Sequence, residues 1–109
     1  MRKKIKKIPE GMNFYPTAPT EDDWKKLPHD MFLLPHIWVD NMRYLSSDAF
    51  IVLPHIANAQ FSKGVKPRAL TIEEIYEYSN KKETTLDSIR KACQELIDKK
   101  FIYPEMVKF

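Results

Sequence analysis

Two closely spaced helix starts between residues 69 and 103 constrain the fold of this chain most strongly. Thr71 begins a capping box with Glu74, in which the threonine hydroxyl accepts the amide three residues on and the glutamate reaches back. Thr84 predicts the start of a second helix as its cap, and Asp87 is favourable near the positive end of that helix. Because residues 79–83 separate the two patterns, the segment predicts a helix-turn-helix.

The second predicted helix has an apolar stripe that we expect to face the core. Its members recur at helical spacing: Leu86, Ile89, Cys93, Leu96 and Ile97. The apolar run 101–103, which Pro104 ends, predicts a short strand that pairs with residues 68–70. The fold class expected from these elements is mainly α with a small β-sheet.

A third helix is predicted before this pair. Ser46 and the two residues after it predict a helix start, and the helix is expected to run to about Gln60 with Phe50 and Leu53 facing inward. Pro54 in the middle of this segment predicts a kink or an early ending. Residues 61–68 then form a basic loop with a glycine and a proline.

The N-terminal third has a different character. Residues 9–36 contain five prolines, a spacing that excludes a long helix and predicts an extended strap over residues 9–40. A short helix capped by Thr20 is expected inside it, with Trp24 and Leu27 on its buried face. Residues 1–8 are expected to be a basic flexible tail, and residues 41–109 the folded domain.

Composition limits the classes of function. At 109 residues with 43% apolar content, the chain predicts one folded domain, and no apolar run approaches the ~20 residues of a membrane span. The net charge of +3 is uneven, because residues 2–7 hold five of the 18 basic residues and no acid. The rest of the chain therefore carries 13 basic against 15 acidic residues. A single cysteine, expected to be buried, fits a reducing cytoplasm.

No motif for catalysis is present. The sequence has no glycine-rich phosphate loop, no nucleophile motif and no paired carboxylates, so we expect no enzyme, no cofactor and no small-molecule substrate. Every histidine lies in a Leu-Pro-His triplet, at His29, His36 and His55. These three lack the spacing of a helical ligand pair, and chance recurrence in proline turns is favoured over a zinc site.

Several of these segments together resemble a known family. The sequence Leu45-Ser46-Ser47-Asp48-Ala49-Phe50 before a helix, the basic loop, and the helix patterns 71–75 and 85–102 resemble the winged-helix domain of phage and plasmid replication proteins. The resemblance covers about residues 32–103 and implies binding of origin DNA by the second helix, or a transcriptional role, in a bacterial host cytoplasm.

Two features depart from the family pattern. The family usually has glycine where Lys100 stands, at a helix end that favours a positive φ. Only residues 104–109 follow Tyr103, so we expect a winged helix-turn-helix whose wing is short or missing.

The resemblance makes the second helix the candidate DNA reader. At 3.6 residues per turn, the face opposite the apolar stripe includes Glu95 and Asp98, which we expect to stay clear of phosphate. The half that enters a major groove offers these candidate contacts: Thr84, Thr85, Asp87, Ser88, Arg90 and Lys91. Basic residues expected at the DNA backbone are Lys63, Lys66, Arg68, Lys81 and Lys82, with Arg2, Lys3 and Lys4 of the tail.

A second interpretation is a winged-helix fold used to bind protein, as a dimerising regulator or as an inhibitor of a host protein. The acids on the outer helix face and the reduced wing favour it. So do the aromatic residues of the strap, which offer an interface: Phe14, Tyr15, Trp24, Phe32 and Trp38.

Overall fold

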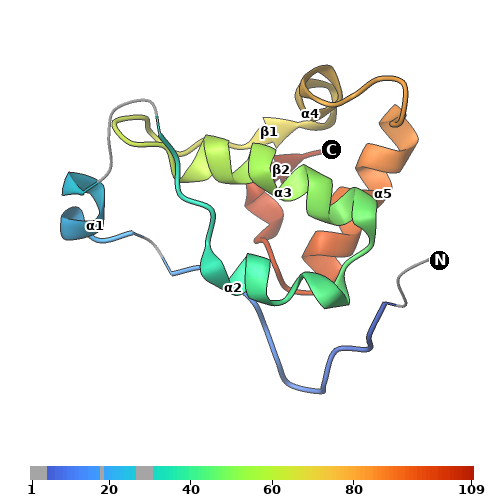
Figure 1. Cartoon of the computed structure of the whole chain (residues 1–109). Helices are drawn as coiled ribbons and strands as arrows, with labels where there is room; N and C mark the ends of the chain where they lie inside the picture. The colour runs from blue at the N-terminus through green and yellow to red at the C-terminus, as the bar shows by residue number, and fades with distance from the viewer. Residues whose placement is uncertain (1–4, 18, 27–30) are drawn as a thin grey trace.

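The computed structural model describes residues 5–17, 19–26 and 31–109 (Figure 1). The described chain runs through α1 (Glu21–Lys25), α2 (His36–Asp40), the 3₁₀ turn η1 (Met42–Tyr44), α3 (Ser47–Gln60), β1 (Leu70–Thr71), α4 (Ile72–Tyr78), α5 (Leu86–Asp98), the 3₁₀ turn η2 (Pro104–Met106) and β2 (Val107–Lys108). The expected class, mainly α with a small sheet, is confirmed. Within the described chain, no helix is long and apolar enough to cross a membrane.

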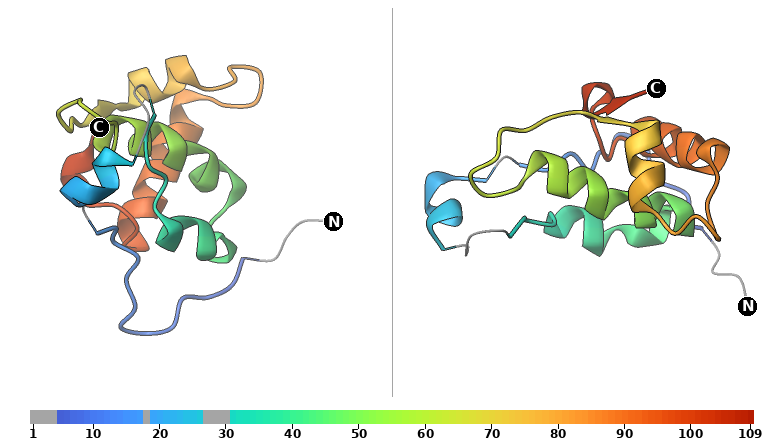
Figure 2. Two further views of the ribbon diagram at one scale, coloured as in Figure 1. Left: turned by 60° about the vertical axis from the view of Figure 1, so that its left-hand side comes forward. Right: turned by 90° about the horizontal axis from the view of Figure 1, so that it is seen from above.

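Helix α3 is the central element of the domain. Ser46 caps it as predicted, its Oγ accepting the backbone amide of Ala49 at 3.2 Å. The helix does not end early at Pro54, although proline removes one helical hydrogen bond. Leu53 and Ile56 on either side of it are fully buried, and this packing holds the helix through the proline. One end of α3 lies near α4 and α5, and the other near α1 and the 61–68 loop (Figure 2).

The helix-turn-helix forms, with two corrections to the start of its second helix. The capping box of α4 is present, since the Glu74 amide donates to Thr71 Oγ1 at 3.1 Å and the Thr71 amide donates to Glu74 Oε1 at 3.3 Å. The cap of α5 is Thr85, however, and the prediction of Thr84 is wrong. This change follows from Ser88, which completes a capping box with Thr85. Leu86, predicted to face inward, is 41% exposed on the first turn of α5.

Helix α5 ends in a Schellman motif built on Lys100. The Lys100 amide donates to the Ile97 carbonyl at 3.1 Å, and the Phe101 amide donates to the Leu96 carbonyl at 2.9 Å. Lys100 has φ 60°, in the left-handed region that glycine usually occupies. Lysine therefore occupies a backbone conformation that glycine adopts more readily.

The predicted strand at 101–103 is wrong. Phe101 and Ile102 are fully buried. The Phe101 amide donates to the Leu96 carbonyl, and the Phe101 carbonyl accepts the Trp38 indole N–H, which leaves neither group for a strand ladder. The strand forms instead in β2, after η2, and pairs in parallel with β1 through Leu70↔Val107 and Thr71↔Lys108. No wing hairpin forms between the described residues of this region.

The proline-rich strap belongs to the core. Trp38 is fully buried, and its indole Nε1 donates to the carbonyls of Phe14 (3.1 Å) and Phe101 (3.0 Å). Because Phe14 is also buried, the prediction that these two rings offer an interface is wrong. Helix α1 forms with the predicted Thr20 cap, but its Trp24 is only half-buried, and Leu27 lies outside the described residues.

Candidate functional site

The exposed face of α5 is the candidate site. Ile89, Ala92, Cys93 and Leu96 bury the opposite side of the helix against the domain. Exposed side chains therefore gather on one stripe, which runs along Leu86, Asp87, Arg90, Lys91, Gln94 and Asp98. Compared with the predicted face, this stripe is turned toward Leu86 and Gln94, because α5 buries Ala92 and leaves Leu86 exposed.

Three predicted base contacts at the start of α5 have local partners. Thr84 is buried and its hydroxyl donates to the Asn80 carbonyl at 2.9 Å, so its placement on the outer face is wrong. Ser88 is half-buried, donates to the Thr85 carbonyl at 2.9 Å and accepts the Thr85 amide at 2.8 Å. Thr85 Oγ1 accepts the Ser88 amide at 3.0 Å. These side chains hold the first turn of α5 together.

The cations near α5 differ in their pairing. Lys91 bonds Asp87 one turn away at 3.2 Å, and Lys81 bonds Glu77 at 2.9 Å. Both pairs are exposed and weak, so a phosphate can replace either carboxylate. Arg90 and Lys82 are exposed, and neither has an ion pair within the described part of the chain.

The other basic residues do not all gather at α5. Arg68 bonds Glu74 at 2.8 Å, and this hydrogen bond lowers the pKa of the glutamate. The 61–68 loop, with Lys63 and Lys66, projects from the end of α3 remote from the α4–α5 turn (Figures 1 and 2). Residues 2–4 of the predicted basic tail lie outside the described chain, while the Lys6 amide donates to the Arg43 carbonyl at 3.1 Å.

Glu95 has a different role from the one predicted. It is half-buried, and its carboxylate accepts the Ser46 amide at 2.8 Å, the Ser46 hydroxyl at 2.6 Å and Lys99 Nζ at 3.0 Å. Its placement on the outer face is therefore wrong. Burial alone would raise the pKa of Glu95, but the hydrogen bonds from Ser46 and Lys99 outweigh it and lower the pKa. Glu95 joins α5 to the N-terminus of α3.

The two described histidines and the cysteine lie in different surroundings. His36 is exposed, His55 is half-buried and stacks on Tyr78 with ring centroids 6.0 Å apart, and His29 lies outside the described residues. Burial lowers the pKa of His55 and raises that of Cys93 to about 12. Over the described ranges, no three potential metal ligands lie together.

Sequence reasoning missed two features of the molecule. The Glu95–Ser46 contact joins residues 49 positions apart, and no local signal announces it. An apolar groove at the opposite end of α3 is built from separate segments of chain, which no motif connects. Comparisons of the chain with protein-family models, with curated proteins and with solved structures find no match.

Proposed function

We propose that this protein binds double-stranded DNA through the α4–α5 unit, with the first half of α5 in the major groove. The observation that supports this proposal is the exposed stripe of α5 on a helix that is fixed at both ends. The Thr85 box fixes its start, and the Lys100 turn fixes its end. A recognition helix needs such fixing, because a small displacement moves its side chains out of reach of the base edges.

The exposed residues of the first half offer specific chemistry. Arg90 can bond the O6 and N7 atoms of a guanine in a bidentate manner, and Leu86 can contact a thymine methyl group. Lys82 in the preceding turn is close enough in sequence to reach a flanking phosphate. The protein would act in replication initiation or transcriptional regulation, in the cytoplasm of a bacterial host.

Charge on the stripe predicts a modest affinity. Asp87 and Asp98 balance Arg90 and Lys91, so the outer face has no net charge. Because Glu95 bonds Ser46 and does not lie on this face, the net charge of the face is less negative than the sequence indicated. Non-specific attraction then depends on the few cations nearby, and the slope of log K against log salt should be small, at ~0.9 for each phosphate that is neutralised.

The test is the affinity for random duplex at two salt concentrations, measured by fluorescence anisotropy. Replacing Arg90 and Lys91 by alanine should weaken binding and reduce the slope of log K against log salt by ~0.9 for each phosphate that is no longer neutralised. The matched control is Lys25→Ala with Lys26→Ala, which removes two exposed cations from α1 and its C-terminal end. Equal decreases in affinity in both double variants would reduce the effect to net charge and would contradict the proposal. Ser88→Ala is unsuitable, because it also breaks the capping box that Ser88 forms with Thr85.

A second candidate function is protein binding by the same stripe. Leu86 is a large exposed apolar residue with acids at Asp87 and Asp98, an arrangement that suits a protein partner. Under this alternative, wild-type protein shows no duplex affinity at low salt, and Leu86→Ala abolishes binding of a partner that co-purifies with the wild type. Reversal of Asp98 to lysine strengthens DNA binding under the first proposal and weakens partner binding under the second.

A further inference from the structure

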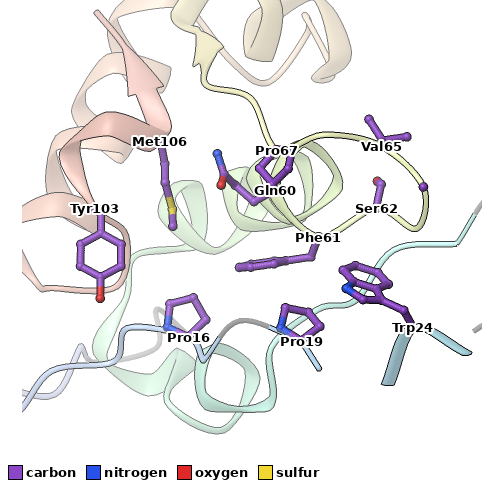
Figure 3. A pocket seen from close by; sticks show the side chains of 11 residues that line it. Pro16, Pro19, Trp24, Gln60, Phe61, Ser62, Val65, Pro67, Tyr103 and Met106 are labelled. Atoms are coloured by element: carbon purple, nitrogen blue, oxygen red, sulfur yellow. The ribbon is translucent and has the colours of Figure 1, made fainter. Parts of the chain in front are cut away.

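An apolar groove of about 450 Å³ lies at the end of α3 remote from the α4–α5 turn (Figure 3). Four parts of the chain line it: the strap, α1, the end of α3 with the following loop, and the segment around η2. Its lining includes three aromatic residues and three prolines, namely Trp24, Phe61, Tyr103, Pro16, Pro19 and Pro67. A volume of this size suits a small organic molecule.

The walls formed by Phe61, Tyr103 and the 61–68 loop are held in place by contacts within the protein. Phe61 is only 7% exposed, and its ring lies 5.9 Å from the buried ring of Trp38. The Tyr103 ring stacks on Tyr15 with centroids 4.2 Å apart and planes only 6° apart. The loop wall is fixed by the Leu33 amide, which donates to the Phe61 carbonyl at 3.0 Å. A groove with fixed walls binds without a large ordering cost.

The groove also holds a few polar groups with unused capacity. Gln60 Nε2 donates to the Arg68 carbonyl at 2.9 Å, which orients the amide and leaves its oxygen as an acceptor. Within the described residues, neither the Trp24 indole N–H nor the Tyr103 hydroxyl has a hydrogen-bond partner. Amphipathic rings of this kind contribute a flat apolar face together with a donor. The occupant they fit is flat and has at least one hydrogen-bond acceptor.

Charge around the groove selects against a strongly charged occupant. The charged residues that adjoin the lining residues in sequence are four bases and two acids: Asp23, Lys25, Lys63, Lys66, Arg68 and Glu105. Arg68 is paired with Glu74 at 2.8 Å, and the others differ by a single charge, so neither an anion nor a cation gains a large attraction. We propose that the groove is a binding site for a neutral planar aromatic molecule with a hydrogen-bond acceptor, held between the walls that Trp24, Phe61 and Tyr103 form. The sequence predicted no small-molecule substrate, and this site is a ligand site separate from the α5 stripe.

The chain contains two tryptophans, and this makes the test direct. Trp24 lines the groove, whereas Trp38 is buried with its N–H already bonded. In a ¹H–¹⁵N NMR titration of the full chain with 2-naphthol, the Trp24 indole signal should shift and saturate while the Trp38 signal stays in place. Trp24→Phe assigns the two signals by removing one of them.

Variants at two valines localise the effect. Val65 lines the groove and is 57% exposed, so Val65→Asp places a charge there without disturbing the core. Val39 on α2 is 37% exposed and lies outside the groove, and Val39→Asp is the matched control. Naphthol affinity should fall at least tenfold in the first variant and change less than twofold in the second, with both thermal unfolding midpoints near the wild-type value.

Three results would overturn the proposal. The first is a Trp24 signal that does not move up to the solubility limit of the probe. The second is a signal that shifts without saturating, and the third is a Val65→Asp variant that binds naphthol as well as the wild type. A separate titration of the wild type uses a proline-rich decapeptide, because polyproline segments also bind aromatic grooves. Saturation by the peptide without saturation by naphthol would assign the groove to a protein partner and reject the small molecule.

Discussion

Replacement of Lys100 by glycine should stabilise the protein. Lys100 has φ 60° at the end of α5, and a left-handed backbone costs a residue with a Cβ atom roughly 1–2 kcal/mol. Glycine removes that cost but has more freedom in the unfolded chain, which offsets about 0.5–1 kcal/mol. The lysine side chain is exposed and makes no ion pair within the described chain, so its removal breaks no stabilising interaction. The difference is a net gain of about 0.5–1 kcal/mol.

The measurement is thermal and urea unfolding of the wild type and two variants. For a chain of this length, a gain of that size corresponds to a rise in Tm of about 2–4 °C. Lys100→Ala is the control, because alanine keeps the Cβ atom and the strained φ, and its Tm should lie near that of the wild type. A Lys100→Gly variant that is less stable, or an alanine variant that gains as much, would show that residue 100 does not have a left-handed backbone.

Two further substitutions test the packing of α5. Glu95→Gln should cost about 1–2 kcal/mol at pH 7, because charge-assisted bonds to Ser46 and Lys99 are weakened at a half-exposed site. The hydrogen bonds hold the folded-state pKa of Glu95 below its ordinary value of 4.5, so its contribution is present above that value and is lost as the pH falls through the folded pKa. The gap between wild type and variant in urea unfolding should therefore narrow in acid, and a gap independent of pH would contradict this role. Leu96→Ala should cost ~2–5 kcal/mol because the side chain is fully buried, and a decrease in stability below half a kcal/mol would show that α5 is placed wrongly.

Local chemistry made three helix starts predictable. The cap at Ser46 and the capping boxes at Thr20 and Thr71 each involve residues within three positions, which a sequence displays directly. Adjacent threonines at the start of α5 both suit a cap, and Ser88 decides between them by completing the box with Thr85. The prediction therefore placed the cap one residue too early, at the buried Thr84.

Long-range contacts explain what the sequence did not reveal. The Trp38 indole bonds carbonyls 24 and 63 positions away, and this contact converts an apparent surface aromatic into the centre of the core. The same bond occupies the Phe101 carbonyl, which the expected strand 101–103 would have used for pairing. The observed strand is β2, which pairs in parallel with β1. The groove depends on four segments that approach one another only in the fold, and the sequence places no two of its walls together.

The most direct test of the proposed function is a map of the duplex-binding surface. Amide signals of ¹⁵N-labelled wild-type protein should be followed at low salt during titration with a random-sequence DNA duplex. The largest shifts should fall on residues 80–91, at the α4–α5 turn and the first half of α5, and added salt should reverse them. Shifts confined to the 61–68 loop or to the N-terminal tail, or no shifts at all, would contradict it.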